Sequence, residues 1–402
     1  MRDNKIDLSS NNSSNNDVNY PDLYKKVYGS LPDNWLVGHV EKVRTGHAVN
    51  DDIRSKAASG GVLTQTLIYL LENNLVDSVI VAKQGVPTPE KASAVIASTR
   101  EEILACAGSV YIPVVMLDIL DELDPNKRYA ITCLPEESAS LRIMQQDKDS
   151  TSMQIKYVLG PYTGTALDPE AISCYLKSKN ISTNDPIVSL KWRAGEWPGY
   201  LEVITKSGKV IRTPKVYYNF LIPFFVTDAS LQSMDFVNEF ADLAVGDAWS
   251  PVFEKLGGGH SVVVTRNNEM ESIITNMCKE GLLELKEEEI LKASDMHGHM
   301  LDFKKRGGWL RNEWKRKLGK EVPDYGYRPK EMPFSRVLVE VIISAIFIIG
   351  RTKLARWIVS KVPESVIGPI FNFLRLNWKK LSRPTKRKGL ANFEVEITKK
   401  RS

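Results

Sequence analysis

The feature that most constrains this fold is a small-residue turn over residues 56–64, which runs into a helical pattern and then into a strand. Apolar residues recur at helical spacing over residues 62–71. Residues 75–82 are β-branched and almost continuously apolar, which is typical of a strand covered on both faces. A helix that leads into such a strand is a unit of an α/β sheet. The sequence therefore predicts an α/β fold.

The turn itself has the composition of an anion site. Ser59 stands where a helix N-cap would stand, and Gly60 and Gly61 lack the Cβ atoms that keep a backbone away from a ligand. Free N–H groups at a helix start attract anions, and Lys56 lies just upstream. The turn is therefore either a phosphate cradle or an ordinary loop with its helix cap.

The rest of the chain predicts a mixed sheet with flanking helices. Further strands are expected over residues 92–97, 129–132, 154–159, 241–249 and 261–266, and helices over residues 114–123 and 269–283. Another helix is expected to open at residues 99–102, and one to run through residues 141–142. Thr99 and Glu102 have the spacing of a capping box. From residue 187 the pattern changes to short alternating strands, which predicts an inserted antiparallel sheet.

Composition and charge exclude several classes of protein. The formal net charge of +5 is modest and lies largely in the C-terminal tail, so no nucleic-acid partner is expected. The four cysteines have no metal-ligand spacing and fit a reducing compartment, which indicates a cytoplasmic protein. Residues 1–20 are rich in Asn, Ser and Asp, and we expect a disordered leader there rather than a secretory signal.

The composition shifts again over residues 333–402. Residues 337–349 are almost wholly apolar but shorter than the ~20 residues that span a bilayer. Amphipathic segments follow over residues 354–362 and 366–376, and a basic tail comes after them. Apolar helices flanked by Trp, Lys and Arg predict peripheral attachment to an anionic membrane surface. The alternative is a helical extension packed on the body or on a neighbouring subunit.

Five motifs occur in an order and spacing that one family shares. They are Ser59-Gly60-Gly61-Val62, Thr99-Arg100-Glu101-Glu102-Ile103-Leu104, Leu141-Arg142, Ala241-Asp242-Leu243-Ala244-Val245-Gly246-Asp247-Ala248-Trp249 and Gly259-His260-Ser261-Val262-Val263-Val264-Thr265-Arg266. Through them residues 35–310 resemble the coenzyme F420 hydrogenase/dehydrogenase beta-subunit family, which also contains 7-hydroxymethyl chlorophyll a reductase. Members of this family typically hold FAD and iron–sulfur clusters.

The resemblance implies an FAD site built on glycine loops. The cofactor-binding residues that it implies are Lys56, Ser59, Gly60, Gly61, Thr64, Arg142, Asp247, Gly258, Gly259 and Ser261. His260, beside three glycines, is the candidate for catalytic proton transfer, and a structural histidine is the alternative. For Arg142 a structural ion pair remains open, and for Asp247 and residues 257–259 an ordinary turn and surface loop.

The chain departs from the family where cluster thiolates are expected. The residues at those positions are Glu136, Thr163, Ser230 and Ser233. Oxygen side chains are poor replacements for a thiolate set, so we expect no iron–sulfur cluster. Cys133, near the first position, is interpreted as a buried structural cysteine. His297 and His299 have the spacing of a metal pair but lack further ligands, and we expect a solvated loop there.

The resemblance therefore implies a flavin-binding oxidoreductase subunit without a cluster. It would exchange hydride or electrons with coenzyme F420 or a similar soluble donor, or with a redox partner protein, and it would act in an oligomer. The alternative is a catalytically degenerate relative that serves as a binding or assembly protein at a membrane.

Overall fold

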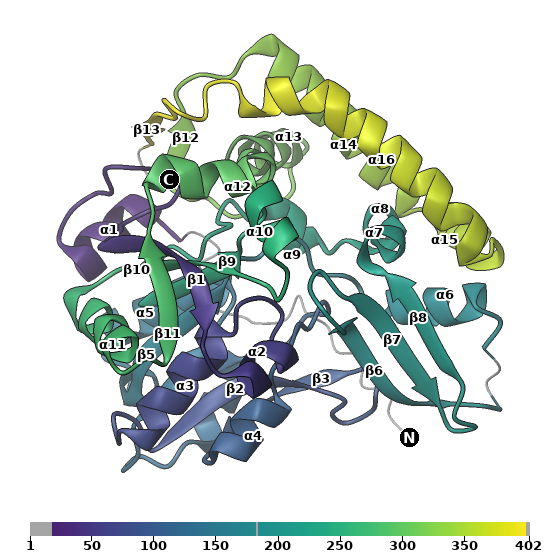
Figure 1. Cartoon of the computed structure of the whole chain (residues 1–402). Coiled ribbons are helices and arrows are strands. Elements are labelled where there is room, and N and C mark those ends of the chain that lie inside the picture. Colours follow the sequence, from purple (N-terminus) through teal and green to yellow (C-terminus); the bar gives the residue numbers. More distant parts are fainter. Residues whose placement is uncertain (1–17, 182–183, 399–402) are drawn as a thin grey trace.

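The computed structural model describes residues 18–181 and 184–398, and its centre is a mixed sheet (Figure 1). Within these residues the largest sheet has eight strands in the order β11-β1-β10-β9-β5-β4-β2-β3. The inner strands β9, β5, β4 and β2 are parallel, and the strands outside them run antiparallel to their neighbours. The strands are β1 (Lys42–Ala48), β2 (Ser78–Gln84), β3 (Ala92–Ala97), β4 (Tyr129–Thr132), β5 (Ile155–Pro161), β9 (Leu243–Asp247), β10 (Ser261–Thr265) and β11 (Leu283–Glu287).

Helices cover both faces of this sheet. One face packs on α3 (Val62–Glu72), α4 (Arg100–Ala105) and α11 (Asn268–Lys279). The other face packs on η1 (Leu117–Glu122), α5 (Pro135–Gln146) and α12 (Ile290–Asp302). Burial of β10 on both sides explains its unbroken apolar run, since Val262 and Val264 face α12 while Val263 faces α11.

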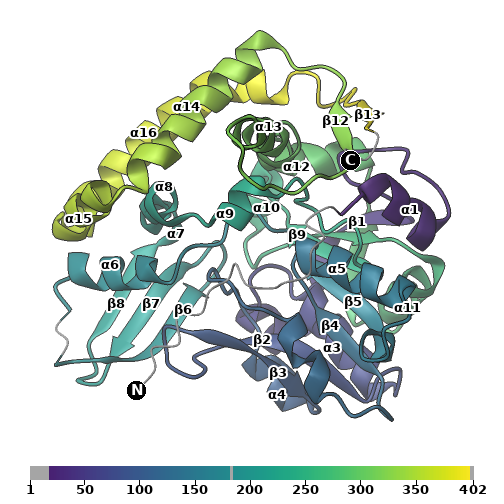
Figure 2. The same cartoon turned by 180° about the vertical axis from the view of Figure 1, so that it is seen from behind.

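A second sheet with its own core lies beside the first (Figure 2). It consists of β6 (Ile187–Ala194), β7 (Tyr200–Thr205) and β8 (Val210–Pro214), all antiparallel. Its inner face packs on α6 (Glu170–Ser178) and on the short helices α7 (Lys215–Tyr218), η3 (Asn219–Leu221) and α8 (Ile222–Phe225). Trp192, Tyr175 and Phe220 form the centre of this core. The inserted antiparallel sheet expected from the sequence is confirmed.

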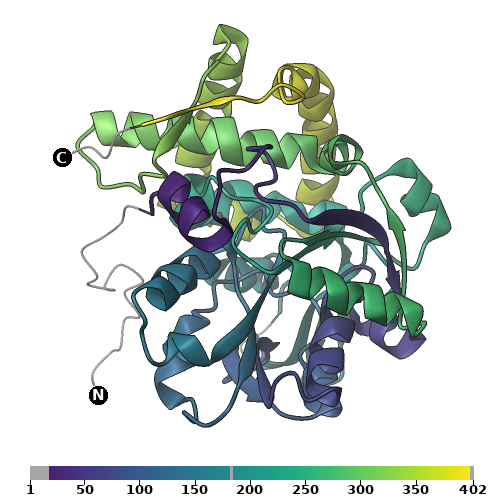
Figure 3. The same ribbon diagram turned by 90° about the vertical axis from the view of Figure 1, so that its left-hand side faces the viewer.

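The remaining elements close the ends of the molecule. They are α1 (Tyr20–Tyr28), α2 (Asp51–Lys56), η2 (Ser152–Gln154), α9 (Asp228–Gln232), α10 (Pro251–Leu256), η4 (Phe303–Gly308), α13 (Trp309–Lys317), α14 (Phe334–Gly350), α15 (Lys353–Lys361), α16 (Glu364–Arg387) and the ribbon of β12 (Tyr327–Pro329) with β13 (Val395–Ile397). Helices α14 to α16 lie across one end of the body (Figure 3). Within the described residues no helix combines the length and the hydropathy needed to cross a bilayer.

The predicted fold class is confirmed, while several local predictions need correction. β3 and β4 have the expected bounds, and Thr99 and Glu102 form the capping box of α4. The helix expected over 114–123 is only the short turn η1. The strand expected over 241–249 is β9, and a Cβ on its Gly246 would meet the ring of Tyr162 at 2.3 Å. Of the leader expected over residues 1–20, residues 1–17 lie outside the described residues, and Tyr20 begins α1.

Candidate functional site

The two predicted loops of the FAD site lie in contact. The hydroxyl of Ser59 donates a hydrogen bond to the carbonyl oxygen of His260 at 2.5 Å. The N–H of Gly60 donates to Ser261 Oγ at 3.1 Å, and the carbonyl of Gly60 accepts from the N–H of Ala48 at 2.7 Å. The structure therefore brings the turn before α3 together with the loop between α10 and β10.

The structure corrects the expected role of two residues in this turn. The N-cap of α3 is Gly61, whose φ of 77° is left-handed, and Ser59 is two residues further upstream. A Cβ on Gly60 would lie 2.7 Å from the carbonyl oxygen of Gly46 and 2.9 Å from Ser261 Oγ. The close backbone approach that Gly60 permits is therefore to strands β1 and β10 of the chain itself.

The other predicted residues of the loops are held by local contacts. Lys56 is half exposed and pairs with Asp52 one turn earlier at 2.8 Å. Thr64 is buried in the first turn of α3. The carbonyl oxygens of Gly258 and Gly259 accept from the guanidinium of Arg54 at 2.7 and 3.0 Å, so a side chain of α2 fixes the backbone of this loop.

His260 lies at the centre of this loop contact. Its ring stacks on Phe253, with centroids 4.8 Å apart, and meets the edge of His47 at 5.1 Å. Burial and then the charge of Arg54 lower the pKa of His260 to about 4. Nδ1 of this ring is buried and has no hydrogen-bond partner among the described residues. His260 is thus a neutral imidazole with an open position, as a proton acceptor requires.

Asp247 joins these loops to the second sheet. At the end of β9 its carboxylate lies 2.8 Å from the guanidinium of Arg193 on β6, and the exposed fractions of the two side chains are 16% and 4%. Nη2 of Arg193 is buried and has no partner within the described part of the chain. A buried guanidinium with an unused donor is a ready site for a carbonyl or anionic oxygen.

Aromatic rings and a second cation surround Arg193 and Asp247. The rings of Trp197 and Trp249 lie 4.5 Å apart, and Nζ of Lys215 is 5.2 Å from the ring of Trp249 and 5.6 Å from that of Tyr111. Nε1 of Trp197 is another buried donor that no described residue accepts from. We name Tyr111, Arg193, Trp197, Lys215, Asp247 and Trp249 the inter-sheet site.

Tyr111 has an unusual charge environment in this site. Burial raises the pKa of its hydroxyl, but the positive charges of Lys215 and Arg193 and a hydrogen bond with Lys215 outweigh burial, so that the pKa lies below its ordinary value. An easily ionised phenol beside an ammonium group can deliver or accept a proton. The inter-sheet site also adjoins the glycine loops, since the N–H of Ala248 donates to the carbonyl of His260 at 2.8 Å.

Arg142 lies apart from this group. Its guanidinium donates to Asp242 at 2.6 Å, to the carbonyl of Phe240 at 3.0 Å and to Gln145 at 2.9 Å. Asp242 in turn accepts from the N–H of Val158 on β5. Of the two readings left open by the sequence, the structure therefore shows the ion pair, which ties α5 to β5 and β9.

Three of the four positions aligned with cluster thiolates lie near η4, the segment that carries two buried lysines. Nζ of Lys304 donates to the carbonyl of Ser230 at 2.9 Å, and burial lowers the pKa of Lys304 to about 8 while the nearby charge of Glu136 opposes that shift. Ser233 lies against η4, because a Cβ on Gly308 would meet its carbonyl oxygen at 2.8 Å. The hydrophobic pattern of the sequence does not predict that these lysines are buried, because lysine side chains are almost never buried unless they are paired.

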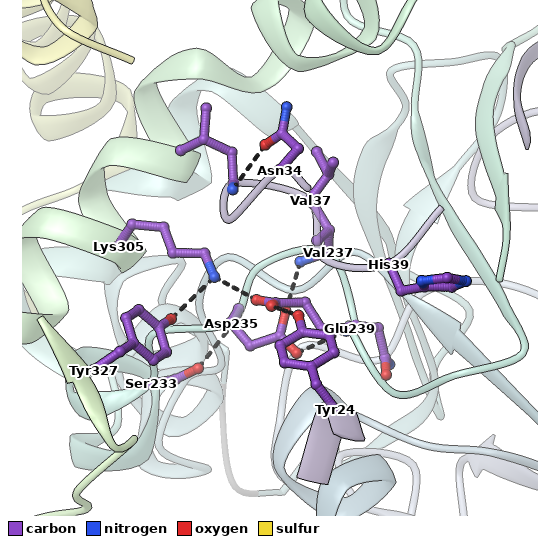
Figure 4. Close-up of polar contacts among 12 residues, drawn as sticks. Tyr24, Asn34, Val37, His39, Ser233, Asp235, Val237, Glu239, Lys305 and Tyr327 are labelled. Atoms are coloured by element: carbon purple, nitrogen blue, oxygen red, sulfur yellow. Dashed lines mark hydrogen bonds and ion pairs between the residues drawn. The ribbon is translucent and has the colours of Figure 1, made fainter. Parts of the chain in front are cut away.

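The neighbouring lysine, Lys305, forms a second buried network in this region (Figure 4). Nζ of Lys305 pairs with one carboxylate oxygen of Glu239 and donates to the hydroxyl of Tyr327, while Tyr24 donates to the other oxygen of Glu239. The side chains of Lys305 and Glu239 are fully buried. Charged protein groups thus lie beside these positions, and the oxygen side chains there do not fit an iron–sulfur cluster.

Of the remaining predictions, the one for Cys133 is confirmed and the one for His297 and His299 is wrong. Cys133 is buried, as expected for a structural cysteine. His297 and His299 are not in a solvated loop, because both lie on α12 and His297 packs between the rings of Tyr162 and Phe236. Within the described residues no group of three His, Cys, Asp or Glu side chains is placed to hold a metal ion.

Comparison with known proteins agrees with these observations. The N-terminal family model of the coenzyme F420 hydrogenase/dehydrogenase beta subunit matches residues 43–121, and the C-terminal model of the same subunit matches residues 126–290. The coenzyme F420 hydrogenase subunit beta of Methanosarcina barkeri is 23% identical over 54% of this chain and 76% of its own length. That of Methanothermobacter thermautotrophicus is 24% identical over 64% of this chain and 88% of its own.

A solved structure has the same fold. A chain of the F420-reducing [NiFe] hydrogenase complex from Methanosarcina barkeri matches with a TM-score of 0.58 and 20% identity, over 72% of this chain and 96% of that one. At this identity the likeness concerns the fold alone. The two family models together match more than half of the chain, and the chain therefore belongs to the coenzyme F420 hydrogenase/dehydrogenase beta-subunit family.

Proposed function

We propose that this chain is a flavin-binding oxidoreductase subunit that exchanges hydride or electrons with coenzyme F420 or a similar soluble donor. The observation that carries the proposal is the inter-sheet site, where Arg193 and Trp197 present buried donors that no described residue uses. The rings of Trp249 and Tyr111 and the ammonium of Lys215 stand beside them. Such a set fits a planar heteroaromatic ring with carbonyl oxygens, which is the chemistry of an isoalloxazine.

The glycine loops would hold the rest of an FAD molecule. Lys56 lies at the end of α2, and the turn of Ser59, Gly60 and Gly61 leads into α3 without an acidic residue in its first turn. A helix start of this kind suits a phosphate. A bound flavin would supply the hydride chemistry, and the protein would orient it and set the charge around it.

We assign proton handling to the side chains nearest these loops. Tyr111, held beside Lys215, can release a proton, and His260 stays neutral and can accept one. Nearby cations lower the pKa of both groups, so the phenol of Tyr111 ionises more readily while the imidazole of His260 stays neutral.

The proposal includes the absence of an iron–sulfur cluster, supported by the oxygen side chains at the aligned positions and by the buried lysines between them. Electrons would then leave through the flavin to a deazaflavin coenzyme or to a redox partner protein in an oligomeric assembly. The relatives are named as hydrogenase subunits, which favours such an assembly. Stoichiometric iron in the purified protein would overturn this part of the proposal.

The experiment is flavin reconstitution with two matched variants. Arg193→Gln removes the buried donor at the inter-sheet site, while Arg212→Gln removes an exposed arginine of the same sheet that pairs with Glu202. We expect the wild-type chain and Arg212→Gln to retain FAD through gel filtration and Arg193→Gln to lose it. Equal retention by both variants would move the flavin elsewhere.

The second candidate is a degenerate family member that binds or assembles other proteins at a membrane. The buried network of Lys305, Glu239 and Tyr24 favours it, because a network of this kind is structural and takes no part in electron transfer. Failure of the wild-type chain to take up any flavin would favour this candidate over the first.

A further inference from the structure

Helix α14 carries its charges on the inner face and apolar side chains on the outer face. Arg336 and Glu340 are fully buried and lie 2.9 Å apart. Arg336 also pairs with Asp302 at 2.7 Å, and Glu340 pairs with Arg311 of α13 at 2.5 Å. The charged residues thus fasten α14 to the body of the protein.

The outer face of α14 is a stripe of exposed apolar side chains. Its members recur at the spacing of one helix face, three to four residues, with Val341 and Ile342 side by side in the middle: Phe334, Leu338, Val341, Ile342, Ile346 and Ile349. Phe334 is 81% exposed and Ile349 is 66% exposed. A surface helix of a water-soluble protein normally buries its apolar side chains and exposes its charged ones. The reverse arrangement on α14 indicates that something apolar covers its outer face.

The stripe continues on the next two helices. Leu354 and Trp357 of α15 are 67% and 60% exposed, and Ile370, Phe373, Leu374 and Leu381 of α16 are each more than half exposed. Helices α14 and α16 contact each other and lie along the outer edge of the molecule in two opposite views (Figures 1 and 2). We name these exposed side chains of α14, α15 and α16 the C-terminal apolar face.

Positive charge accompanies this face. Residues 351–388 contain eleven Lys and Arg residues and one acidic residue, Glu364, which is buried against Lys179. Several of the cations are exposed, namely Lys353, Lys361, Lys380, Arg383 and Lys388. Two copies of such a surface would repel each other, whereas anionic headgroups would attract it.

We propose that the C-terminal apolar face binds the surface of an anionic lipid bilayer, with α14, α15 and α16 lying in the plane of the interface. The apolar side chains would enter the boundary between headgroups and acyl chains, and the lysines would meet lipid phosphates. Trp357 has the amphipathic ring that favours this depth. The face belongs to residues beyond the family matches, so it adds a location to the chain independently of any flavin.

The experiment is flotation of the full-length protein with lipid vesicles. Vesicles of phosphatidylcholine alone are compared with an equal mixture of phosphatidylcholine and phosphatidylglycerol. We expect binding to the mixed vesicles, weakened by added salt because the surface charges are screened, and little binding to the neutral ones.

Three variants test whether vesicle binding depends on this face in particular or on any exposed apolar residue. Ile349→Glu places a charge on the outer side of α14, and Lys353→Glu/Lys361→Glu reverses two of the exposed cations. The control is Leu318→Glu, which changes a 76% exposed leucine next to α13. We expect each of the first two variants to lower vesicle affinity about tenfold or more and the control to bind as the wild-type chain does.

Because these side chains are exposed, all three variants should keep the wild-type unfolding temperature, which excludes misfolding as the cause. The proposal is overturned if the wild-type chain does not float with the mixed vesicles, or if Ile349→Glu floats as well as Leu318→Glu. A wild-type dimer that Ile349→Glu dissociates, without vesicle binding, would assign the face to a second copy of the chain instead.

Discussion

The guanidinium of Arg193 on β6 lies 2.8 Å from the carboxylate of Asp247 at the end of β9, so one ion pair joins the small antiparallel sheet to the central sheet. Both side chains are largely buried, and the remaining donor of Arg193 points to no described acceptor. The pair therefore holds the end of β6 against the end of β9, and it leaves one N–H donor of Arg193 available to a ligand.

Loss of the Asp247 charge is expected to destabilise the protein. Asp247→Asn leaves the buried guanidinium of Arg193 without its counter-ion, which costs about 2–4 kcal/mol of unfolding free energy. The measurement is urea unfolding. Glu396→Gln is the control, since it breaks an exposed pair with Arg328 and should change stability by less than about 0.5 kcal/mol. Equal effects of the two substitutions would contradict the account of this junction.

A methyl group on Gly60 is expected to disturb the contact between the two loops. Its Cβ would lie 2.7 Å from the backbone oxygen of Gly46, which cannot move without shifting β1. Gly60→Ala should lower stability by about 1–3 kcal/mol. Gly164→Ala is the matched control, because its Cβ would come close only to the flexible tip of Met300. A Gly60→Ala protein as stable as the control would show that the turn is looser than described.

His297 predicts an acid-dependent loss of stability. Burial lowers the pKa of His297 to about 4, whereas an unfolded histidine titrates near 6.5. Between these values the unfolded chain binds a proton that the folded chain does not bind, so unfolding becomes easier as pH falls from about 7 to about 4. His297→Gln should flatten this part of the pH profile by about 2–3 kcal/mol in urea unfolding. An unchanged slope would refute this assignment.

The buried pair of Lys305 and Glu239 predicts a non-additive double substitution. Lys305→Met alone leaves a fully buried carboxylate whose remaining side-chain partner among the described residues is Tyr24, and it should cost about 3–5 kcal/mol. Adding Glu239→Gln removes that charge, so the double variant should be more stable than Lys305→Met. Additive losses in thermal or urea unfolding would show that the two groups do not interact.

Tyr111 is expected to ionise before the buried tyrosines Tyr20, Tyr24 and Tyr327. The charges of Lys215 and Arg193 hold its pKa below the ordinary value, whereas burial raises the pKa of Tyr20, Tyr24 and Tyr327 well above it. Absorbance titration of the wild-type chain should show a tyrosinate step below about pH 10, which Tyr111→Phe removes. Superimposable titration curves would exclude Tyr111 as the acidic group.

The central sheet could be predicted because its signals are local. The β-branched runs of β2, β4 and β10 and the capping box of Thr99 each specify structure within a few residues. The glycine loops were also found in the sequence, and the two hydrogen bonds that join them, from Ser59 to His260 and from Gly60 to Ser261, each span 201 positions of the chain.

The inter-sheet site could not be predicted in the same way. Tyr111, Arg193 and Lys215 come from three separate segments, and none of them stands in a motif with fixed spacing. Trp249 ends the family motif over residues 241–249, but the motif alone did not mark it as a site residue. The buried lysines of η4 were missed because a Lys-Lys-Arg run normally marks a solvated surface. Their partners are acidic residues far away in the sequence, such as Glu239 for Lys305, so no local pattern marks these lysines as buried.

The central claim is that this chain is a flavoprotein whose ring site lies between the two sheets. Its most direct test is the visible spectrum of the full-length protein after incubation with FAD and gel filtration, together with the flavin content per chain. We predict the two absorption bands of an oxidised flavin at close to one FAD per chain for the wild type, and their loss in Arg193→Gln. A colourless wild-type protein that takes up no FAD would contradict the claim.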